Sequence, residues 1–152
     1  MDVVERVLSF WYDKEAPNLA ADGDHRMAWF NKDDAFDKAI RDQFEADVTA
    51  AANGEYDALR KTVEGVLTLT ILLDQFPRNL YRGSPQAFAT DALALDIVKG
   101  AVASGFDAEL GKTRRMFLYL PFEHSENLND QDMAVRLLRE RDPPLTIPVG
   151  II

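Results

Sequence analysis

The strongest constraint on the fold is the spacing of the apolar residues, which recur every three or four positions along much of the chain. The pattern is clearest in two sets: Val3, Val4, Val7, Leu8 and Trp11, and then Phe36, Ile40, Phe44, Val48 and Ala51. This spacing places the apolar side chains on one face of an α-helix. The pair Asn53-Gly54 is typical of the cap that ends a helix. We therefore predict two amphipathic helices before residue 54, separated by a polar loop over residues 17–25.

Residues 57–76 carry a pattern that fits two kinds of secondary structure. Some apolar residues alternate with their neighbours as in a β-strand, namely Leu67, Leu69, Ile71 and Leu73. A helical stripe fits equally well, through Leu59, Val63, Val66, Thr70 and Leu73. Periodicity alone leaves this choice open. The helical patterns on both sides favour a helix, and because it would be apolar nearly all round, we expect it at the centre of the core.

A further helix is expected from residue 84 to residue 105. Ser84 is a good N-cap, and Pro85 suits the first helical position because proline lacks the N–H that would be unpaired there. Apolar residues then recur along one face up to Gly105, at Phe88, Ala92, Leu95, Val98 and Val102.

The last two helices are expected at residues 113–120 and after Asn129, whose side chain could cap the helix. The sequence Asp-Pro-Pro at 142–144 should end it, because a residue before proline avoids helical geometry. We therefore predict one all-α domain of about six helices over residues 1–142, with no sheet. Residues 143–152 should form a non-helical C-terminal tail.

Length, charge and hydropathy exclude several classes of protein. The 152 residues suit a single core, and the net charge of −9 would repel the phosphate backbone of a nucleic acid. The most apolar stretch, residues 66–73, is far shorter than the roughly 20 residues of a membrane helix. The N-terminus has acidic residues where a signal peptide has basic ones. We expect a cytoplasmic protein with no nucleic-acid or membrane partner.

Cofactor and metal motifs are absent from the sequence. There is no cysteine, which excludes disulfides, thiolate nucleophiles and cysteine-ligated metals. The chain has two histidines, His25 and His124, and contains neither a P-loop nor a G-x-G-x-x-G motif. We expect no metal and no cofactor, and the sequence does not specify an oligomeric state.

The first polar motif, Asp-Gln-Phe-Pro-Arg-Asn, occupies residues 74–79. Pro77 should kink or end the helix, because its ring clashes with the carbonyl four residues earlier. One interpretation is a turn between helices, held by side-chain hydrogen bonds to the freed carbonyls. The other is a ligand site in which Arg78 and Arg82 clamp a carboxylate or phosphate through their planar guanidinium groups. The candidate ligand-binding residues are Asp74, Gln75, Arg78, Asn79 and Arg82, together with Ser125 from the second motif.

The second polar motif, Glu-His-Ser-Glu, occupies residues 123–126 and follows a run of apolar residues. Phe122 should anchor the segment in the core, so the charged residues after it should lie at a boundary where they need partners. His124 could transfer protons, or it could be a structural imidazolium in a network of acids and arginines. The candidate catalytic residues are His124, Glu123 and Glu126.

The chain resembles the bacterial domain-of-unknown-function family 924 across residues 7–138. The resemblance is carried by VLSFWY, AWF, FDKAIRDQFEAD, LLDQFPRNLYRGSPQAFATDALAL and RRMFLYLPFEHSENL. It implies antiparallel helix hairpins in a right-handed, tetratricopeptide-repeat-like array, and it implies no activity. The family motif also includes Pro77 and Asp91. Family members continue with a helical segment rich in Arg, Phe and His, where this chain has PPLTIPVGII. A truncation or an altered reading frame would explain that difference, and could remove part of the site.

Three functional hypotheses follow from the two motifs. The leading one is a binding module that holds a small anion or a peptide in a groove between helix hairpins. The alternative is a hydrolase-type enzyme in which His124 is the general acid or base, oriented by Glu123 or Glu126, and Arg78 stabilises negative charge. The third is that both motifs only lock helix turns. The first two hypotheses require the motifs to meet in space.

Overall fold

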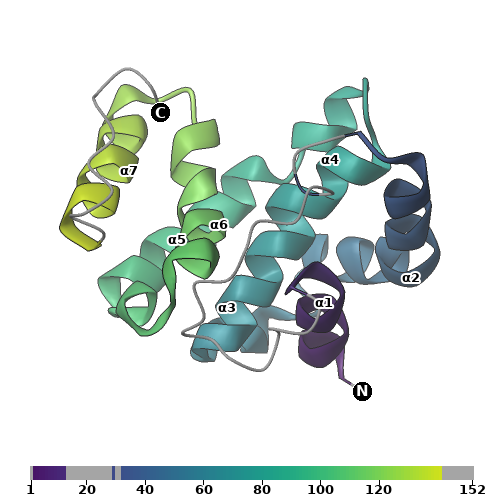
Figure 1. Cartoon of the computed structure of the whole chain (residues 1–152), viewed down its shortest axis with the longest axis horizontal. Helices are drawn as coiled ribbons and strands as arrows, with labels where there is room; N and C mark the ends of the chain where they lie inside the picture. Colours follow the sequence, from purple (N-terminus) through teal and green to yellow (C-terminus); the bar gives the residue numbers. More distant parts are fainter. Residues whose placement is uncertain (1, 13–28, 30–31, 142–152) are drawn as a thin grey trace.

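The computed structural model describes residues 2–12, 29 and 32–141, and within this part of the chain the fold is all-α (Figure 1). The helices are α1 (Val3–Tyr12), α2 (Asp34–Ala52), α3 (Val63–Thr70), α4 (Phe76–Leu80), α5 (Asp91–Ala103), α6 (Lys112–His124) and α7 (Leu128–Arg141). Short helical turns separate some of them: η3 (Asp57–Lys61), η4 (Ile71–Gln75), η5 (Pro85–Phe88) and η6 (Phe106–Glu109). No strand occurs among the described residues. The predicted all-α class is confirmed.

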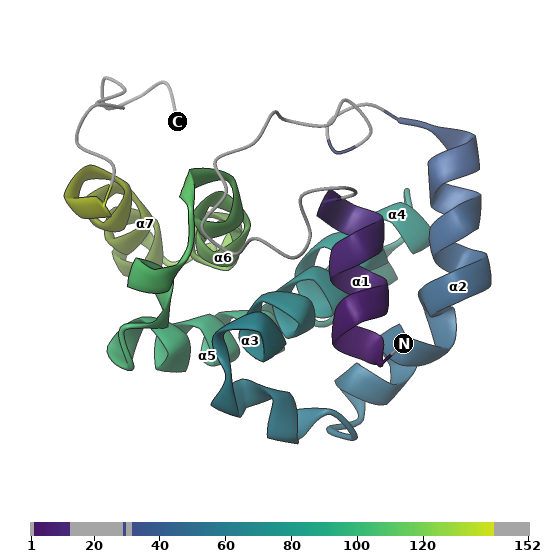
Figure 2. The same ribbon diagram turned by 60° about the horizontal axis from the view of Figure 1, so that its bottom comes forward.

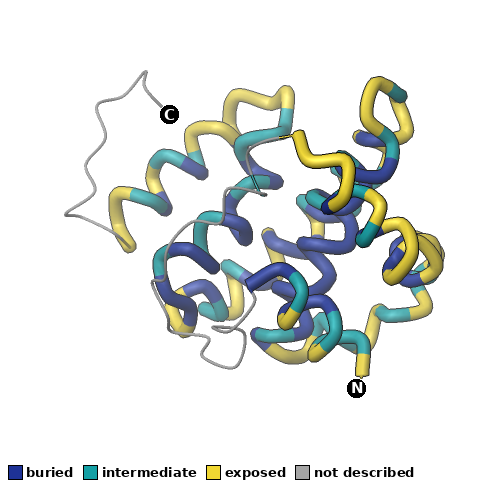
Figure 3. Tube along the Cα trace, turned by 45° about the vertical axis from the view of Figure 1, so that its right-hand side comes forward, coloured by how far each residue is buried: buried dark blue, intermediate teal, exposed yellow. Residues whose placement is uncertain are grey.

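The central element is one continuous helical rod made of α3, the π-helical turn η4 and α4. It contacts α1, α2, α5 and α6, and Figure 3 shows it as the most continuously buried part of the chain. Its large, fully buried apolar side chains are Leu67, Leu69, Ile71, Leu72, Leu73 and Phe76. The prediction of a central helix in this segment is therefore confirmed. Counting the rod once, the described residues form six helical rods, which agrees with the predicted number.

The two ends of this central segment differ from the sequence-based expectation. Residues 57–61 form a separate 3-10 turn, because the side chain of Thr62 caps α3 by accepting a hydrogen bond of 3.0 Å from Gly65 N. At the other end, the chain does not leave the helix at Pro77 but continues to Leu80. Just before Pro77, over Ile71–Gln75, the chain winds as a π-helix, in which the N–H of Phe76 donates to the carbonyl of Ile71. Single π-helical turns inside α-helices are rare and are often found at functional sites.

Pro77 leaves the carbonyl of Leu73 without its usual helical donor, because proline has no N–H. The hydroxyl of Thr90 donates to this carbonyl at 2.6 Å. At the end of α4, Arg41 Nη2 donates to the carbonyl of Leu80 at 2.7 Å. Freed carbonyls therefore do take side-chain donors, as expected. These two donors, Thr90 and Arg41, come from segments distant in sequence and not from the motif itself.

Helices α1 and α2 lie on one side of the central rod, and α6 and α7 lie on the other (Figure 2). Asp47 of α2 ties the first group together. Its carboxylate accepts hydrogen bonds of 2.9 and 3.0 Å from Arg6 of α1 and of 2.6 Å from the hydroxyl of Tyr56. On the other side, α7 packs against α6, and Arg141 pairs with the buried Asp107 at 3.1 Å.

The predicted helix over 84–105 is wrong at its start. Ser84 caps only the 3-10 turn η5, by accepting a hydrogen bond from Gln86 N, and α5 begins at Asp91. The short turn changes the helical register, so Phe88 is 58% exposed. The residues that α5 buries are Ala94, Ile97, Val98 and Ala101.

Two further boundaries also differ. Helix α6 continues through Pro121 to His124, so the second motif begins on a helix instead of after one. Helix α7 begins at Leu128, and the cap is Asn127, whose Oδ1 accepts a hydrogen bond of 2.8 Å from Asn129 N. The predicted loop over 17–25 and the predicted tail lie outside the described residues. The right-handed tetratricopeptide-like arrangement stays a prediction.

Within the described part of the chain, no helix combines the length and the apolar character needed to cross a bilayer.

Candidate functional site

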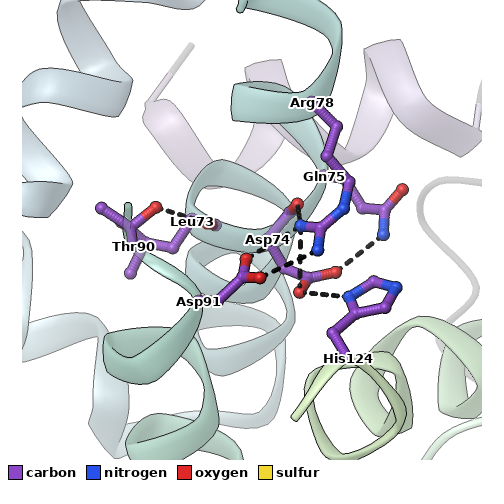
Figure 4. Close-up of polar contacts among 7 residues, drawn as sticks. All are labelled: Leu73, Asp74, Gln75, Arg78, Thr90, Asp91 and His124. Carbon is purple, nitrogen blue, oxygen red and sulfur yellow. Dashed lines mark hydrogen bonds and ion pairs between the residues drawn. The ribbon is translucent and has the colours of Figure 1, made fainter. Parts of the chain in front are cut away.

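The centre of the candidate site is the carboxylate of Asp74, which lies in the π-helical turn η4 (Figure 4). Its side chain has no solvent exposure. Oδ1 lies 2.8 Å from Nδ1 of His124, and Oδ2 accepts a hydrogen bond of 2.7 Å from Nε2 of Gln75. Nη1 of Arg78 approaches Oδ1 to 3.5 Å. These contacts compensate a buried negative charge that would otherwise be costly.

His124 reaches Asp74 from the last residue of α6, on the neighbouring helix. Its side chain is 26% exposed. Because Nδ1 is engaged by the carboxylate, Nε2 is the nitrogen left for solvent or a ligand, and Nε2 makes no hydrogen bond to any described residue. A carboxylate on one ring nitrogen fixes the orientation of an imidazole and its tautomer.

Arg78 is held on its outer side by Asp91, the first residue of α5. The pair is bidentate, with Nη1 to Oδ1 and Nη2 to Oδ2 both at 2.9 Å. Nη1 also donates to the main-chain carbonyl of Asp74, and the ring of Phe88 lies 5.2 Å from the guanidinium carbon. Both terminal nitrogens of Arg78 are therefore engaged within the protein.

Glu123 lies beside this network and is half-buried. Burial raises the pKa of its carboxyl; His124 opposes this shift, and the negative charge of Asp74 adds to it. The carboxylate makes no hydrogen bond or ion pair with the described residues. Glu123 is thus an acid next to the imidazole of His124, and the charged form of this acid is disfavoured.

Asn79 and Arg82 face a different part of the molecule, the first turns of α2. Both bind Asp37: Arg82 Nε at 2.6 Å and Nη2 at 3.2 Å, and Asn79 Nδ2 at 2.9 Å. Partial burial alone would raise the pKa of Asp37, but the hydrogen bonds from Arg82 and Asn79 outweigh it and lower this pKa. The first motif therefore divides. Asp74 contacts His124, Gln75 binds Asp74, and Arg78 faces Asp91 of α5. Asn79 instead lies against α2, as does Arg82 just after the motif.

The remaining candidates, Ser125 and Glu126, lie in the short segment between α6 and α7. The hydroxyl of Ser125 donates to Asp130 at 2.7 Å and accepts from Asn127 N at 3.1 Å, while Lys99 pairs with Asp130 at 3.0 Å. Glu126 is exposed. The acid that orients His124 is thus Asp74, and not Glu123 or Glu126 as the sequence suggested.

Two structural partners, Asp37 and Thr90, were not among the residues expected from the sequence. Asp37 adjoins Phe36 on the buried stripe of α2, and an acid beside such a stripe is a weak signal of a paired carboxylate. Thr90 gives no signal, because its role depends on a carbonyl 17 residues earlier. No group of three or more His, Asp or Glu side chains in the described ranges is placed to hold a metal ion.

Comparisons with known proteins identify a family and give no activity. The profile of a bacterial protein family of unknown function (DUF924) matches residues 7–144. The structure is similar to that of a protein of unknown function from Agrobacterium tumefaciens, with a TM-score of 0.79 and 35% sequence identity. That similarity covers 91% of this chain and 73% of the other. No curated protein matches the sequence significantly.

Proposed function

The chain belongs to the DUF924 family, and from that premise we propose that it is an acid–base enzyme of the hydrolase type in which His124 transfers the proton. The observation that carries the proposal is the contact of 2.8 Å between His124 Nδ1 and Asp74 Oδ1, with Asp74 fully buried and His124 partly exposed. A buried carboxylate behind a partly exposed imidazole suits proton transfer, because the carboxylate orients the ring and stabilises the imidazolium.

In the proposed reaction, one proton moves from a water molecule to His124 and then to the leaving group. When the imidazole is neutral and its Nδ1–H donates to Asp74, Nε2 carries a lone pair directed away from that carboxylate. Nε2 can then take a proton from a water molecule as that water attacks a carbonyl carbon. The imidazolium that forms is stabilised by the charge of Asp74. The same proton is returned to the leaving oxygen when the carbon–oxygen bond breaks.

An anion clamp at Arg78 has less support from this geometry. Both terminal nitrogens of Arg78 already bind Asp91, so a ligand carboxylate would have to displace that pair. The two carboxylates of Asp74 and Asp91 outnumber the single permanent cation, Arg78. Such surroundings favour a neutral substrate over an anionic one, because like charges repel. We therefore propose neutral carboxylic esters as the substrate class.

The test is hydrolysis of p-nitrophenyl acetate and a panel of neutral alkyl esters by the wild type and single variants. His124→Gln should lower kcat/KM by about 100-fold or more, the range typical of a lost general base. Asp74→Asn should also lower it, because the neutral amide no longer stabilises the imidazolium. The matched control is His25→Gln, which replaces the other histidine of the chain and should leave the rate unchanged.

Circular dichroism of each variant separates a lost base from a lost fold. Equal rates in wild type and folded His124→Gln across the whole panel would contradict the proposal. A rate that falls in His25→Gln instead would assign the reaction to His25, and would contradict the proposal as well.

A further inference from the structure

A cavity of about 380 Å³ lies between the first turns of α2 and the end of α4. This volume is within the roughly 300–1,000 Å³ typical of small-molecule sites. Its charged lining residues are Lys32, Lys38, Arg41 and Arg82, with Asp34 and Asp37. We propose that this α2–α4 pocket binds a small anion carrying a phosphate group. The site is independent of the reaction proposed for His124.

Arg82 is the first of two anchored guanidinium groups in the pocket. Its Nε and Nη2 bind Asp37 at 2.6 and 3.2 Å, and Asn79 adds a third hydrogen bond to the same carboxylate. The carboxylate of Asp37 therefore fixes the position of the Arg82 side chain. The third nitrogen, Nη1, donates to no described residue.

Arg41 is the second anchored guanidinium group. Its Nη2 donates a hydrogen bond of 2.7 Å to the carbonyl of Leu80, the last residue of α4. Its Nε lies 3.8 Å from Glu45 in a long, exposed ion pair. Nη1 makes no hydrogen bond within the described ranges. Two guanidinium groups are thus fixed through one edge each, and retain one N–H₂ group each for a ligand.

The pocket is less acidic than the protein as a whole. The whole chain carries −9, whereas the pocket is lined by four cationic residues and two carboxylates. Each cation also has an acidic partner: Arg82 pairs with Asp37, Lys32 with Asp34, Lys38 with Asp42 and Arg41 with Glu45. The pairs of Lys32, Lys38 and Arg41 are exposed, so an anion can compete for these three cations. Arginine suits phosphate in particular, because the planar guanidinium matches its oxygens and is only weakly hydrated.

Lys38 is already paired with an acid, so a bound anion would have to compete with that acid. It pairs with Asp42 at 2.6 Å, but its side chain is 74% exposed, so an anion can compete for it at little cost. The competition predicts moderate affinity that falls as salt screens the charges.

The experiment is a titration of the full chain with inorganic phosphate at low ionic strength, followed by amide NMR shifts. We expect saturable shifts confined to residues 32–41 and 79–82. Arg41→Gln should weaken binding by about tenfold or more, as expected for one charge-assisted hydrogen bond. Lys61→Gln, an exposed cation outside the pocket, is the matched control and should bind as the wild type does. A parallel titration with acetate should give weaker binding if phosphate is the preferred anion.

Two outcomes would overturn the proposal: the absence of saturable shifts at millimolar phosphate, or an equal loss of binding in Lys61→Gln and Arg41→Gln. If Arg41→Gln fails to fold, Lys38→Gln supplies the same test through a mostly exposed side chain. His124→Gln should bind phosphate normally, so failure of the enzyme proposal and failure of this one are distinguishable.

Discussion

Asp74 shows how a single buried carboxylate can organise a site. A charge with no solvent exposure is tolerated only if its oxygens are paired, and here His124 and Gln75 each bind one oxygen while Arg78 lies nearby. The consequence is that His124 has one fixed orientation. The same pairing would also make Asp74 structurally important, so its variants require a folding control.

Glu123 should destabilise the folded protein at neutral pH. Burial first of all raises the pKa of its carboxyl above the ordinary value, so ionisation costs more in the folded state than in the unfolded state. A raised carboxyl pKa contributes stability that is present below the unfolded pKa and is lost as pH rises through the folded pKa. We therefore expect Glu123→Gln to raise the melting temperature at pH 7, with a gain that disappears below the ordinary glutamate pKa.

The control for this prediction is Glu126→Gln, three residues later and exposed. Calorimetry at several pH values should show little change for that variant. A melting temperature of Glu123→Gln equal to or below that of the wild type at pH 7 would show that ionised Glu123 does not destabilise the folded protein.

The central rod shows how two short helical elements are fitted together. The turn η3 packs so closely on α3 that a methyl group at Gly65 would lie 2.1 Å from the main-chain oxygen of Leu59. No real contact is this short, and a backbone atom cannot easily move away. By contrast, a methyl group at Gly100 in α5 would meet no atom within 4 Å.

These two glycines give a matched pair of substitutions. Gly65→Ala should lower the free energy of unfolding by about 1–3 kcal/mol, the usual range for overpacking. Gly100→Ala should raise it by about 0.5–1 kcal/mol, because alanine loses less entropy in a helix. Urea unfolding measures both. Wild-type stability in Gly65→Ala would contradict the close packing of η3 on α3.

Across the whole molecule, Asp47 links α1 to α2, with Arg6 and Tyr56 as its partners. Burial raises the pKa of Asp47, but the hydrogen bonds from Arg6 and Tyr56 lower it more. A lowered carboxyl pKa gives stability that is present above the unfolded pKa and is lost as pH falls through the folded pKa. This link should therefore weaken in acid.

Asp47→Asn should lower the free energy of unfolding at pH 7 by about 1–3 kcal/mol, as expected when charged hydrogen bonds are removed from a mostly buried group. The difference from the wild type should shrink as the pH falls through the carboxyl range. Urea titrations at pH 7 and in acid measure this difference. Asp42→Asn, which alters an exposed ion pair, should change little at either pH, and a constant penalty for Asp47→Asn at all pH values would exclude an ionic origin.

Most of the secondary structure is predictable from the sequence, because a helix is made by hydrogen bonds between residues four apart. The face of α2 from Phe36 to Ala51 is buried as its spacing predicts. The start of α5 was not predictable in this way, because the 3-10 turn η5 interrupts the register after Ser84. Local patterns cannot show where such a turn passes into a helix.

The partners of the polar residues depend on the tertiary structure. Asp74 and His124 are 50 residues apart, and Arg82 and Asp37 are 45 apart. Which acid meets which cation is decided by how the helices pack, and packing places Asn79 and Arg82 against α2 while Arg78 faces α5. Residue types and their spacing thus indicated that polar groups would need partners. The choice among those partners came from packing between helices that are distant in sequence, which no short segment of the chain encodes.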